Sequence, residues 1–204
     1  MIINFTKLRG YIVSNYYHFK HLYNLRISKK IIIGSSGTFH DGWFATDFPE
    51  IDISSITQCE KYWKKNSKAA FLAEHVWEHL SKEEATKGAA SCFYFLQKKG
   101  RLRIAVPDGN HPDPDYIDYV RPGGTGSGAN DHKILFKIDS LTEIFEKVGF
   151  RVIPLEHWDN KSNFHKSEWD IKWGKVSRSA EFDPRNQSNK TLSYTSIIID
   201  CHKD

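Results

Sequence analysis

The stretch Lys29–Asp47, KKIIIGSSGTFHDGWFATD, decides the fold. Its apolar run Lys30–Ile33 predicts a short buried strand that ends in four small residues at 34–37. A turn without bulky side chains lets the backbone lie directly against a ligand. A second strand, Trp43–Thr46, then ends on Asp47. A strand, a glycine turn and an acid at the tip of the next strand are how many parallel sheets hold a nucleoside, so we expect a nucleoside site here.

The turn departs from the dinucleotide-binding fingerprint, because the spacing G-x-G-x-x-G is absent. No amphipathic helix follows the turn, since Asp41-Gly42 leads straight into the next strand. Without a helix N-terminus the turn lacks the dipole and the free N–H groups that a pyrophosphate would use. The site therefore suits a nucleoside with a zwitterionic tail better than a dinucleotide. The alternative is an ordinary strand–turn–strand in any α/β domain, because short glycine motifs are common.

The composition is that of a globular chain, with 204 residues, 39% hydrophobic and 26% charged. Three cysteines, Cys59, Cys92 and Cys201, are widely spaced and form neither a disulfide framework nor a CxxC metal site. This pattern indicates a reducing compartment. No apolar run reaches the length of a membrane span, and the N-terminus lacks the apolar core of a signal peptide. We therefore expect a cytoplasmic protein.

The first thirty residues carry six lysines and arginines and no acid, whereas the net charge of the whole chain is only +4. Apolar residues recur there at helical spacing, which predicts a basic amphipathic helix. We expect this helix to pack its apolar side on the domain. Peripheral contact with an anionic membrane and binding of an acidic partner are the alternatives. The apolar positions are Leu8, Tyr11, Ile12, Tyr16, Phe19, Leu22 and Tyr23.

Strands alternate with helices along the rest of the chain, which indicates an α/β fold with a mainly parallel sheet. Ser81 with Glu84 forms a capping box, and Asp139 or Ser140 caps a second helix that Gly149 closes. The long loop 108–130 is rich in proline, glycine and aspartate, as many binding loops are. Further strands are predicted at Glu50–Ile53, Ala69–His75, Arg101–Val106, Phe150–Leu155 and Tyr194–Asp200, and helices at Ser81–Gln97 and Leu141–Val148.

Several motifs follow the glycine turn in a fixed order. Asp47 comes first, then Asp52 within EIDI, then Ala73–Leu80 with the sequence AEHVWEHL. The segment KKGRLRIAVPD and a segment 132–150, which begins with histidine and ends in Gly-Phe, complete the set. In this order the motifs resemble those of class I S-adenosylmethionine-dependent methyltransferases. The resemblance covers nearly all of residues 31–203.

The closest resemblance is to a small group of bacterial predicted methyltransferases whose acceptor is unknown. Its members share GW…D after a shortened first turn, as Gly42-Trp43 and Asp47 do here. Only Gly100 stands where two glycines are usual before the next strand. The tail is also similar to theirs, at Phe164-His165, Trp169, Gly174, Arg178-Ser179, Asp183, Arg185-Asn186 and Tyr194-Thr195-Ser196.

The resemblance implies a Rossmann-like methyltransferase fold, with a mainly parallel sheet, helices on both faces and an antiparallel C-terminal strand. It implies one methyltransferase-like domain over 1–204, with a basic helix at 1–29 and a catalytic core at 30–204 whose aromatic and basic tail spans 156–190. The implied reaction moves a methyl group from S-adenosylmethionine to a small-molecule or saccharide acceptor. The implied setting is bacterial and suits glycan biosynthesis.

Two rival functions stay open. A non-catalytic binding protein could keep the fold and the cofactor, which the shortened first turn favours. An RNA-modifying or RNA-binding protein is the second rival, favoured by the basic N-terminal segment. Its binding would weaken with salt. Nucleic acid is the less favoured partner, because the excess of basic charge is confined to that one segment.

Nine cofactor-binding residues follow from the resemblance. The glycine turn would approach the methionine portion, and Asp47 would accept the ribose hydroxyls. Asp52 would face the adenine edge with the backbone of Ile53, unless both aspartates only close strand-end turns. The two residues at the end of the central strand would meet the ligand where open α/β sheets bind theirs. The set is Gly34, Ser35, Ser36, Gly37, Asp47, Asp52, Ile53, Glu74 and His75.

Methyl transfer to oxygen or nitrogen gains from a base that takes the proton of the acceptor. The candidates are His75, Asp108 and His132, with histidine favoured by its near-neutral reference pKa. A zinc site is one hypothesis for the ligand-type residues Glu74, His75, Glu78 and His79. Their order is not H-E-x-x-H, however. We therefore predict no metal site. The alternatives for these histidines are a cofactor contact, a substrate base or a structural role.

The glycine-rich segment 123–128 lacks the G-K-[ST] ending of a phosphate loop, so we expect either a mobile flap over the site or a surface loop. In the tail, aromatic residues alternate with lysines and arginines. This pattern suits binding of a sugar or a phosphorylated acceptor, and the aromatic rings could also stack on nucleic-acid bases. The alternative is a layer that covers the sheet, in which the tryptophans close the sheet edge and Arg178, Asp183 and Arg185 pair internally. These tail residues are Trp158, Phe164, His165, Trp169 and Trp173, with Lys161, Lys166, Arg178 and Arg185.

Overall fold

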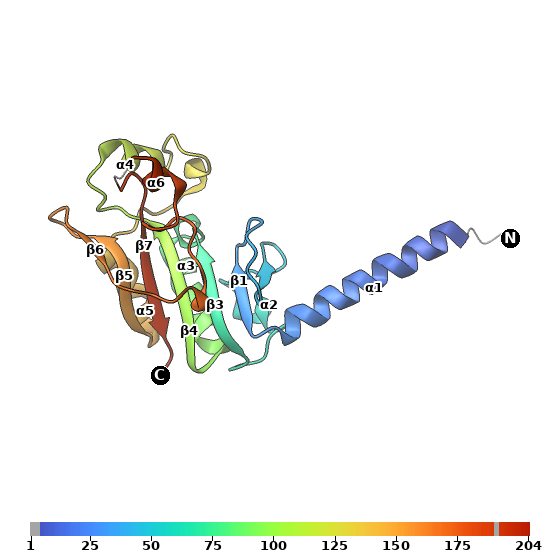
Figure 1. Ribbon diagram of the computed structural model, residues 1–204. Helices are drawn as coiled ribbons and strands as arrows, with labels where there is room; N and C mark the ends of the chain where they lie inside the picture. Colours follow the sequence, from blue (N-terminus) through green and yellow to red (C-terminus); the bar gives the residue numbers. More distant parts are fainter. Residues whose placement is uncertain (1–4, 190–191) are drawn as a thin grey trace.

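A seven-stranded mixed sheet forms the centre of the protein (Figure 1). The computed structural model describes residues 5–189 and 192–204, with side chains from 16 to 187 and from 192 onward. Strand order is β2-β1-β3-β4-β7-β5-β6; the first four strands pair in parallel, and β7 runs antiparallel between β4 and β5. The strands are β1 Lys30–Ile33, β2 Phe44–Thr46, β3 Lys68–Glu74, β4 Leu96–Pro107, β5 Arg151–Trp158, β6 Phe164–Lys166 and β7 Ser196–His202.

The predicted, mainly parallel sheet with an antiparallel C-terminal strand is confirmed. Of the expected strands, Glu50–Ile53 is wrong: this segment is a turn whose two isoleucines are buried in the core. Alternating apolar residues there mark burial, not pairing. The helices are α1 Phe5–Ile27, α2 Ile56–Cys59, α3 Lys82–Phe95, α4 Pro114–Val120, α5 Ile138–Val148 and α6 Pro184–Asn189, with 3-10 turns η1 Trp77–His79, η2 Ala129–Asp131 and η3 Ile171–Trp173.

Helices α3 and α5 pack side by side and bury their apolar residues in the main core. The capping box of α3 is confirmed: Ser81 Oγ accepts from the Glu84 N–H, and the Glu84 carboxylate accepts from the Ser81 N–H at 2.8 Å. Helix α5 starts earlier than expected, with Lys137 as its N-cap. Ser140 is therefore the third helical residue, not the cap. Gly149, with φ of 111°, closes α5 as predicted.

A second apolar cluster is covered by the tail of the chain, where Trp169 and Val176 pack with Leu72 of β3. The tail is tied down by Arg103, which is fully buried and donates to Asp200 at 2.8 and 2.9 Å. The same guanidinium donates to the Gly174 carbonyl and stacks 4.6 Å from the Trp169 ring. The tail covers this apolar cluster largely as irregular chain, because its sequence lacks helical periodicity.

Among its described side chains, those in the C-terminal part of helix α1 fasten it to the domain, and His21 there lies 2.7 Å from the Glu50 carboxylate. Leu25 is buried, and the Lys68 ammonium donates to three carbonyls at that end, those of residues 25, 26 and 28. The rest of α1 projects away from the sheet (Figure 1). Lys68 thus anchors the helix from within β3.

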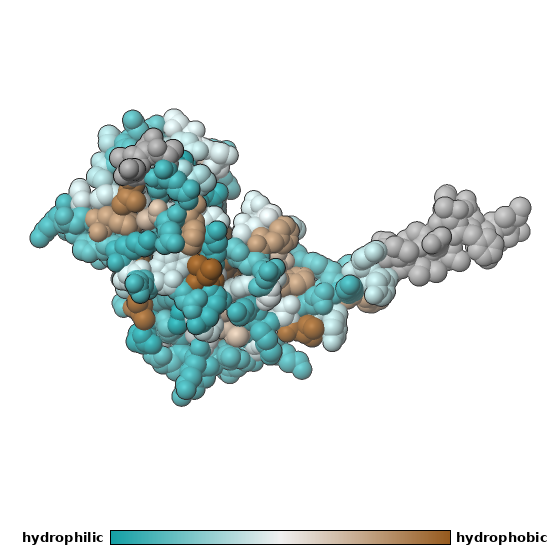
Figure 2. All heavy atoms as spheres, in the orientation of Figure 1, coloured by the Kyte–Doolittle hydropathy of each residue, from teal (hydrophilic) through white to brown (hydrophobic). Residues whose placement is uncertain are grey.

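The expected packing of the α1 apolar side on the domain is wrong for three of its described side chains, whereas Leu22 is half-buried. Tyr16, Phe19 and Tyr23 are 61%, 69% and 62% exposed, because the helix runs beyond the edge of the sheet. Figure 2 shows that stretch standing clear of the domain. Leu8, Tyr11 and Ile12 lie outside the described side chains. Within the part of the chain that the structure describes, no helix is both long and apolar enough to cross a bilayer.

Candidate functional site

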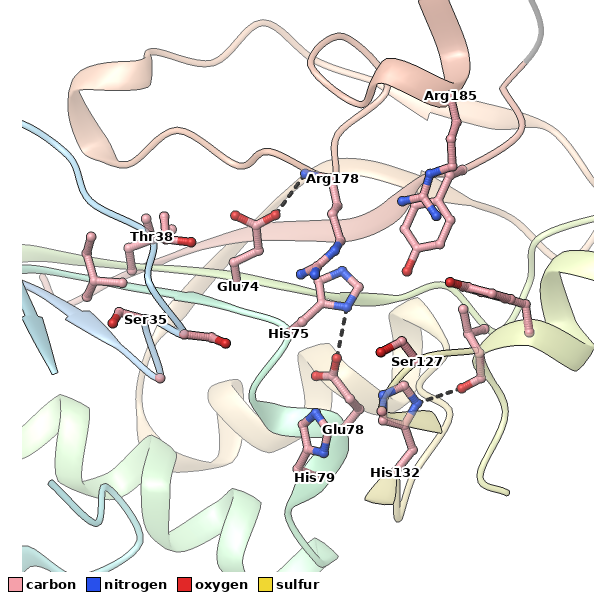
Figure 3. Close-up of a pocket in the computed structure, with 18 residues that line it drawn as sticks. Ser35, Thr38, Glu74, His75, Glu78, His79, Ser127, His132, Arg178 and Arg185 are labelled. Atoms are coloured by element: carbon pink, nitrogen blue, oxygen red, sulfur yellow. Dashed lines mark hydrogen bonds and ion pairs between the residues drawn. The ribbon is translucent and has the colours of Figure 1, made fainter. Parts of the chain in front are cut away.

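A pocket of about 490 Å³ opens at the carboxyl ends of β1 and β3, and we call it the main pocket (Figure 3). Its walls come from the glycine turn, the end of β3, the 3-10 turn η1, the segment 119–132 and the tail. The glycine-rich segment reaches it at Ser127 and Gly128. Six predicted site residues line it: Gly34, Ser35, Ser36, Glu74, His75 and His132.

The glycine turn is a tight corner. Gly34 has a φ of 62°, and a Cβ there would lie 2.5 Å from a methyl carbon of Val76. Ser36 also has a positive φ, of 43°. Asp47 holds this corner, because its carboxylate accepts from the Ser35 hydroxyl at 2.7 Å and from the Ser36 N–H at 2.9 Å. The backbone is therefore fixed in a conformation that leaves the turn open to the pocket.

Asp47 lies at a second cavity, of about 470 Å³, which we call the Asp47 cavity. Gly37 lines this cavity, and Ser35 lines both it and the main pocket. The rings of Phe39 and Phe48 also line it, each 77% exposed. The two cavities therefore meet at Ser35 of the glycine turn.

Asp52 and Ile53 lie away from both cavities. The Asp52 carboxylate accepts from the N–H and the hydroxyl of Ser54, at 3.0 and 2.7 Å, which closes a local turn. The side chain of Ile53 is 4% exposed and belongs to the main core. Turn chemistry, the alternative reading of Asp52, describes the conformation seen here.

Glu74, at the tip of β3, fastens the tail over the main pocket. Its carboxylate accepts from the Ser177 N–H at 3.1 Å and from the Arg178 N–H at 2.8 Å, the second of which Figure 3 shows. Two charge-assisted backbone hydrogen bonds are strong enough to fix the position of a loop. Glu74 therefore positions the tail residues that face the pocket.

His75 follows with a φ of 57°, a conformation that is costly for a residue other than glycine. Its Nε2 lies 3.0 Å from the Ser196 hydroxyl, which itself donates to the Arg178 carbonyl at 2.8 Å. Because that hydroxyl proton is used, His75 Nε2 is the donor to Ser196. Nδ1 then faces the Glu78 carboxylate, 3.0 Å away. The strained backbone thus aims the imidazole at a buried acid.

Asp108 lies outside the main pocket. It is fully buried beside β5, and its carboxylate accepts from the N–H groups of Trp158 and Asn110, at 2.7 and 2.9 Å. Burial raises the pKa of Asp108 to about 6 in spite of these hydrogen bonds. The carboxylate after strand β4 turns inward and joins the following loop to the end of β5, so it does not line the main pocket with His75 and His132.

Sequence reasoning placed Glu78 and His79 only in a zinc alternative, which also included Glu74 and His75 but not His132. The structure instead groups Glu78 and His79 with His132, one ligand-type atom from each lying within 4.8 Å of the others. The only sequence signal was the AEHVWEHL motif itself, which places both residues just after a central strand.

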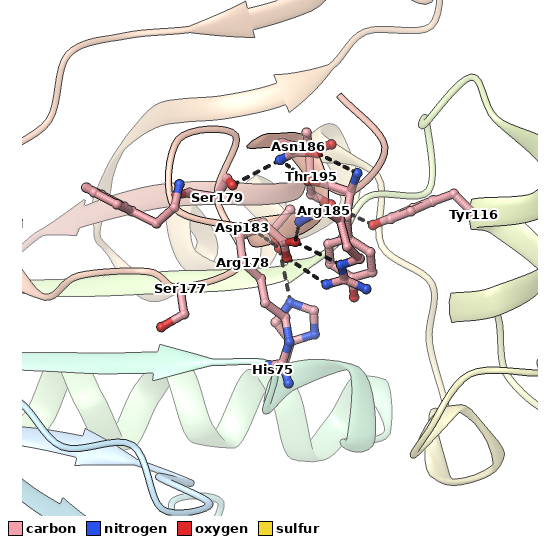
Figure 4. Close-up of polar contacts among 12 residues, drawn as sticks. His75, Tyr116, Ser177, Arg178, Ser179, Asp183, Arg185, Asn186 and Thr195 are labelled. Carbon is pink, nitrogen blue, oxygen red and sulfur yellow. Dashed lines mark hydrogen bonds and ion pairs between the residues drawn. The ribbon is translucent and has the colours of Figure 1, made fainter. Parts of the chain in front are cut away.

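Arg178, Arg185 and Tyr194 bring the tail into the pocket wall. The Arg185 guanidinium lies 3.5 Å from the Tyr194 ring, and Asp183 holds it at 2.6 and 2.8 Å (Figure 4). This confirms the internal Arg185–Asp183 pairing of the covering-layer alternative. The tail motif contained Arg178, Arg185 and Tyr194, and this was the sequence signal for them. The motif could not show that they lie in the pocket wall.

Comparison with known proteins bears on the fold. A scan against models of known families and a search of curated proteins gave no match. An S-adenosylmethionine-dependent methyltransferase from Archaeoglobus fulgidus superposes with a TM-score of 0.52 at 16% identity, over 97% of this chain and 92% of that one. Another, from Thermotoga maritima, gives 0.50 at 11% identity, over 99% and 96% of the two chains. The chain therefore has the Rossmann-like fold of class I S-adenosylmethionine-dependent methyltransferases.

Proposed function

We propose that the protein transfers a methyl group from S-adenosylmethionine to an oxygen or nitrogen of a small-molecule or saccharide acceptor. One observation carries the proposal. The main pocket joins the glycine turn at the end of β1 to a polar cluster at the end of β3, formed by Glu74, His75 and Glu78. In open α/β sheets the carboxyl ends of the strands are where ligands bind. A donor held at the turn would point its methyl group toward that cluster.

The residues present fit the cofactor. Residues 34–37 would hold its methionine portion, because their small side chains admit the backbone to close contact. The Asp47 cavity would hold its adenosine portion. Each Asp47 oxygen accepts one hydrogen bond from the turn and keeps lone-pair capacity for the ribose hydroxyls. The exposed rings of Phe39 and Phe48 offer apolar faces to the base.

The acceptor side of the main pocket is aromatic and cationic. Tyr119, Tyr194, Arg178 and Arg185 line it from two different segments. Aromatic faces bind the apolar face of a sugar ring, and guanidinium groups donate to hydroxyl, carboxylate or phosphate oxygens. These groups supply positioning of the acceptor for in-line transfer, which by itself lowers the barrier. The proton released by the acceptor passes to the polar cluster around His75.

The test is calorimetric titration of S-adenosylmethionine and S-adenosylhomocysteine into wild type and two variants. We expect saturable binding to wild type. Asp47→Ala should weaken it at least tenfold, because the turn loses the carboxylate that holds it and the ribose hydroxyls lose their hydrogen-bond acceptor. Asp41→Ala replaces an exposed acid in the same loop and serves as the matched control, with affinity within twofold of wild type. If neither ligand gives binding heat with folded wild type, the proposal is wrong.

A further inference from the structure

Three side chains of metal-ligating type meet at one end of the main pocket (Figure 3). Glu78 and His79 come from η1, and His132 follows η2. One ligand atom from each lies within 4.8 Å of the other two. Tetrahedral bonds of about 2.1 Å place ligand atoms about 3.4 Å apart, so small side-chain rotations close this set on an ion.

The Glu78 carboxylate is the independent sign that something binds here. The residue is fully buried, and within the described part of the chain neither carboxylate oxygen accepts a hydrogen bond. His75 Nδ1 lies 3.0 Å from Oε1 but outside hydrogen-bonding geometry. Burial of a carboxylate without donors is strongly unfavourable unless a positive group compensates. A cation at the open side of Glu78 supplies that compensation.

Each of the two histidines offers one ring nitrogen to this set. His132 Nδ1 lies 2.7 Å from the Val120 carbonyl, which can only accept, so Nδ1 carries the proton and Nε2 is left as a ligand atom. A backbone carbonyl bonded to the second ring nitrogen is how proteins orient metal-bound histidines. His79 Nδ1 is also buried without a hydrogen bond, 3.4 Å from the Asp131 carboxylate.

We propose that Glu78, His79 and His132 bind one divalent first-row transition-metal ion, such as Zn²⁺, Mn²⁺ or Co²⁺. Two imidazole nitrogens and one carboxylate are typical ligands of these ions. Three protein ligands leave coordination positions open toward the pocket. In a role that rests on the proposed methyl transfer, an acceptor oxygen occupies an open position, and the ion favours loss of its proton.

The first experiment titrates Co²⁺ into full-length protein freed of tag and metal, followed by visible absorption. We expect one Co²⁺ per chain with the d–d bands of a four- or five-coordinate ion, displaced by Zn²⁺. His132→Ala weakens Co²⁺ binding at least tenfold. His165→Ala leaves it within twofold, although it removes an exposed histidine stacked 4.9 Å from His157. Absence of binding to folded wild type, or equal binding to His132→Ala, would overturn the proposal.

Glu78→Gln separates a metal ligand from a merely structural acid. The amide has the same shape without the charge, so the metal-free variant should melt at or above the temperature of metal-free wild type. Zn²⁺ should raise the melting temperature of wild type by several degrees and leave that of Glu78→Gln unchanged. An equal Zn²⁺ shift in both would contradict the site. Calorimetry with S-adenosylmethionine is independent of this readout, so its failure would overturn the proposed function alone.

Discussion

Gly34 combines two constraints that can be separated by mutation. Its φ of 62° is unfavourable for any side chain, and an added Cβ would also meet Val76. Gly37 shares the first constraint, with φ of 86°, but has open space around it. We predict that Gly34→Ala lowers the free energy of unfolding by about 2 kcal/mol and Gly37→Ala by about 1 kcal/mol. Urea denaturation measures both.

The double variant Gly34→Ala/Val76→Ala checks the cause. Removing the Val76 methyl groups relieves the clash but not the backbone strain, so the penalty from Gly34→Ala should be smaller in the Val76→Ala background. An undiminished penalty would show that strain alone makes this position glycine.

Asp108 gives the stability a definite pH dependence. Burial raises the pKa of its carboxyl to about 6, above the ordinary value of 3.8. Between these values the folded chain holds a proton that the unfolded chain has released. The free energy of unfolding therefore falls as pH rises from about 4 to 6, by up to about 1.4 kcal/mol per pH unit from this group. Asp108→Asn should lack this component; an identical slope in both proteins would refute the assignment.

At the scale of elements, Lys68 joins β3 to α1. Its ammonium is buried, and burial lowers its pKa to about 8, yet it donates to three carbonyls at the end of the helix. Lys68→Met should lower the free energy of unfolding by about 2 kcal/mol, because buried carbonyls lose their donor. It should also speed proteolysis within α1. Lys65→Met, at an exposed lysine nearby, is the control and should change neither.

Local signals predicted most elements. The apolar run of β1, the capping box of α3 and the glycine that ends α5 depend on neighbouring residues only, and all three are present. The start of α5 was misplaced by a few residues, because several polar residues there could serve as caps. The strand predicted at Glu50–Ile53 was wrong because a buried turn and a short strand can share the same alternating pattern of apolar residues. The projection of α1 could not be predicted, because helical periodicity shows which residues could be buried and not whether a partner exists.

The candidate site was predicted in part for the same reason. The glycine turn, Glu74 and His75 follow strand ends, so topology alone brings them to one edge of the sheet. Arg178 and Tyr194 reach that edge only through the path of the tail, which depends on contacts with β3 and β7 far away in the sequence. Asp108 also follows a strand end, but it turns inward because the Trp158 and Asn110 N–H groups bind it.

At the scale of the whole molecule, Arg103 and Asp200 hold the tail against the sheet. Both are buried, and the guanidinium also reaches the carbonyls of residues 170 and 174. Asp200→Ala leaves a buried arginine without its anion, so we predict a loss of about 3–5 kcal/mol in the free energy of unfolding. Arg103→Met/Asp200→Leu should recover much of that loss. A double variant as unstable as Asp200→Ala would contradict this account of the pair.

The central claim is that S-adenosylmethionine binds across the carboxyl ends of β1 and β3. Hydrogen exchange with and without S-adenosylhomocysteine tests it most directly. The account predicts slower amide exchange in residues 33–47 and 74–79, which form the glycine turn, the Asp47 brace and the end of β3. Protection confined to other segments, at a ligand concentration that saturates the protein, would contradict it.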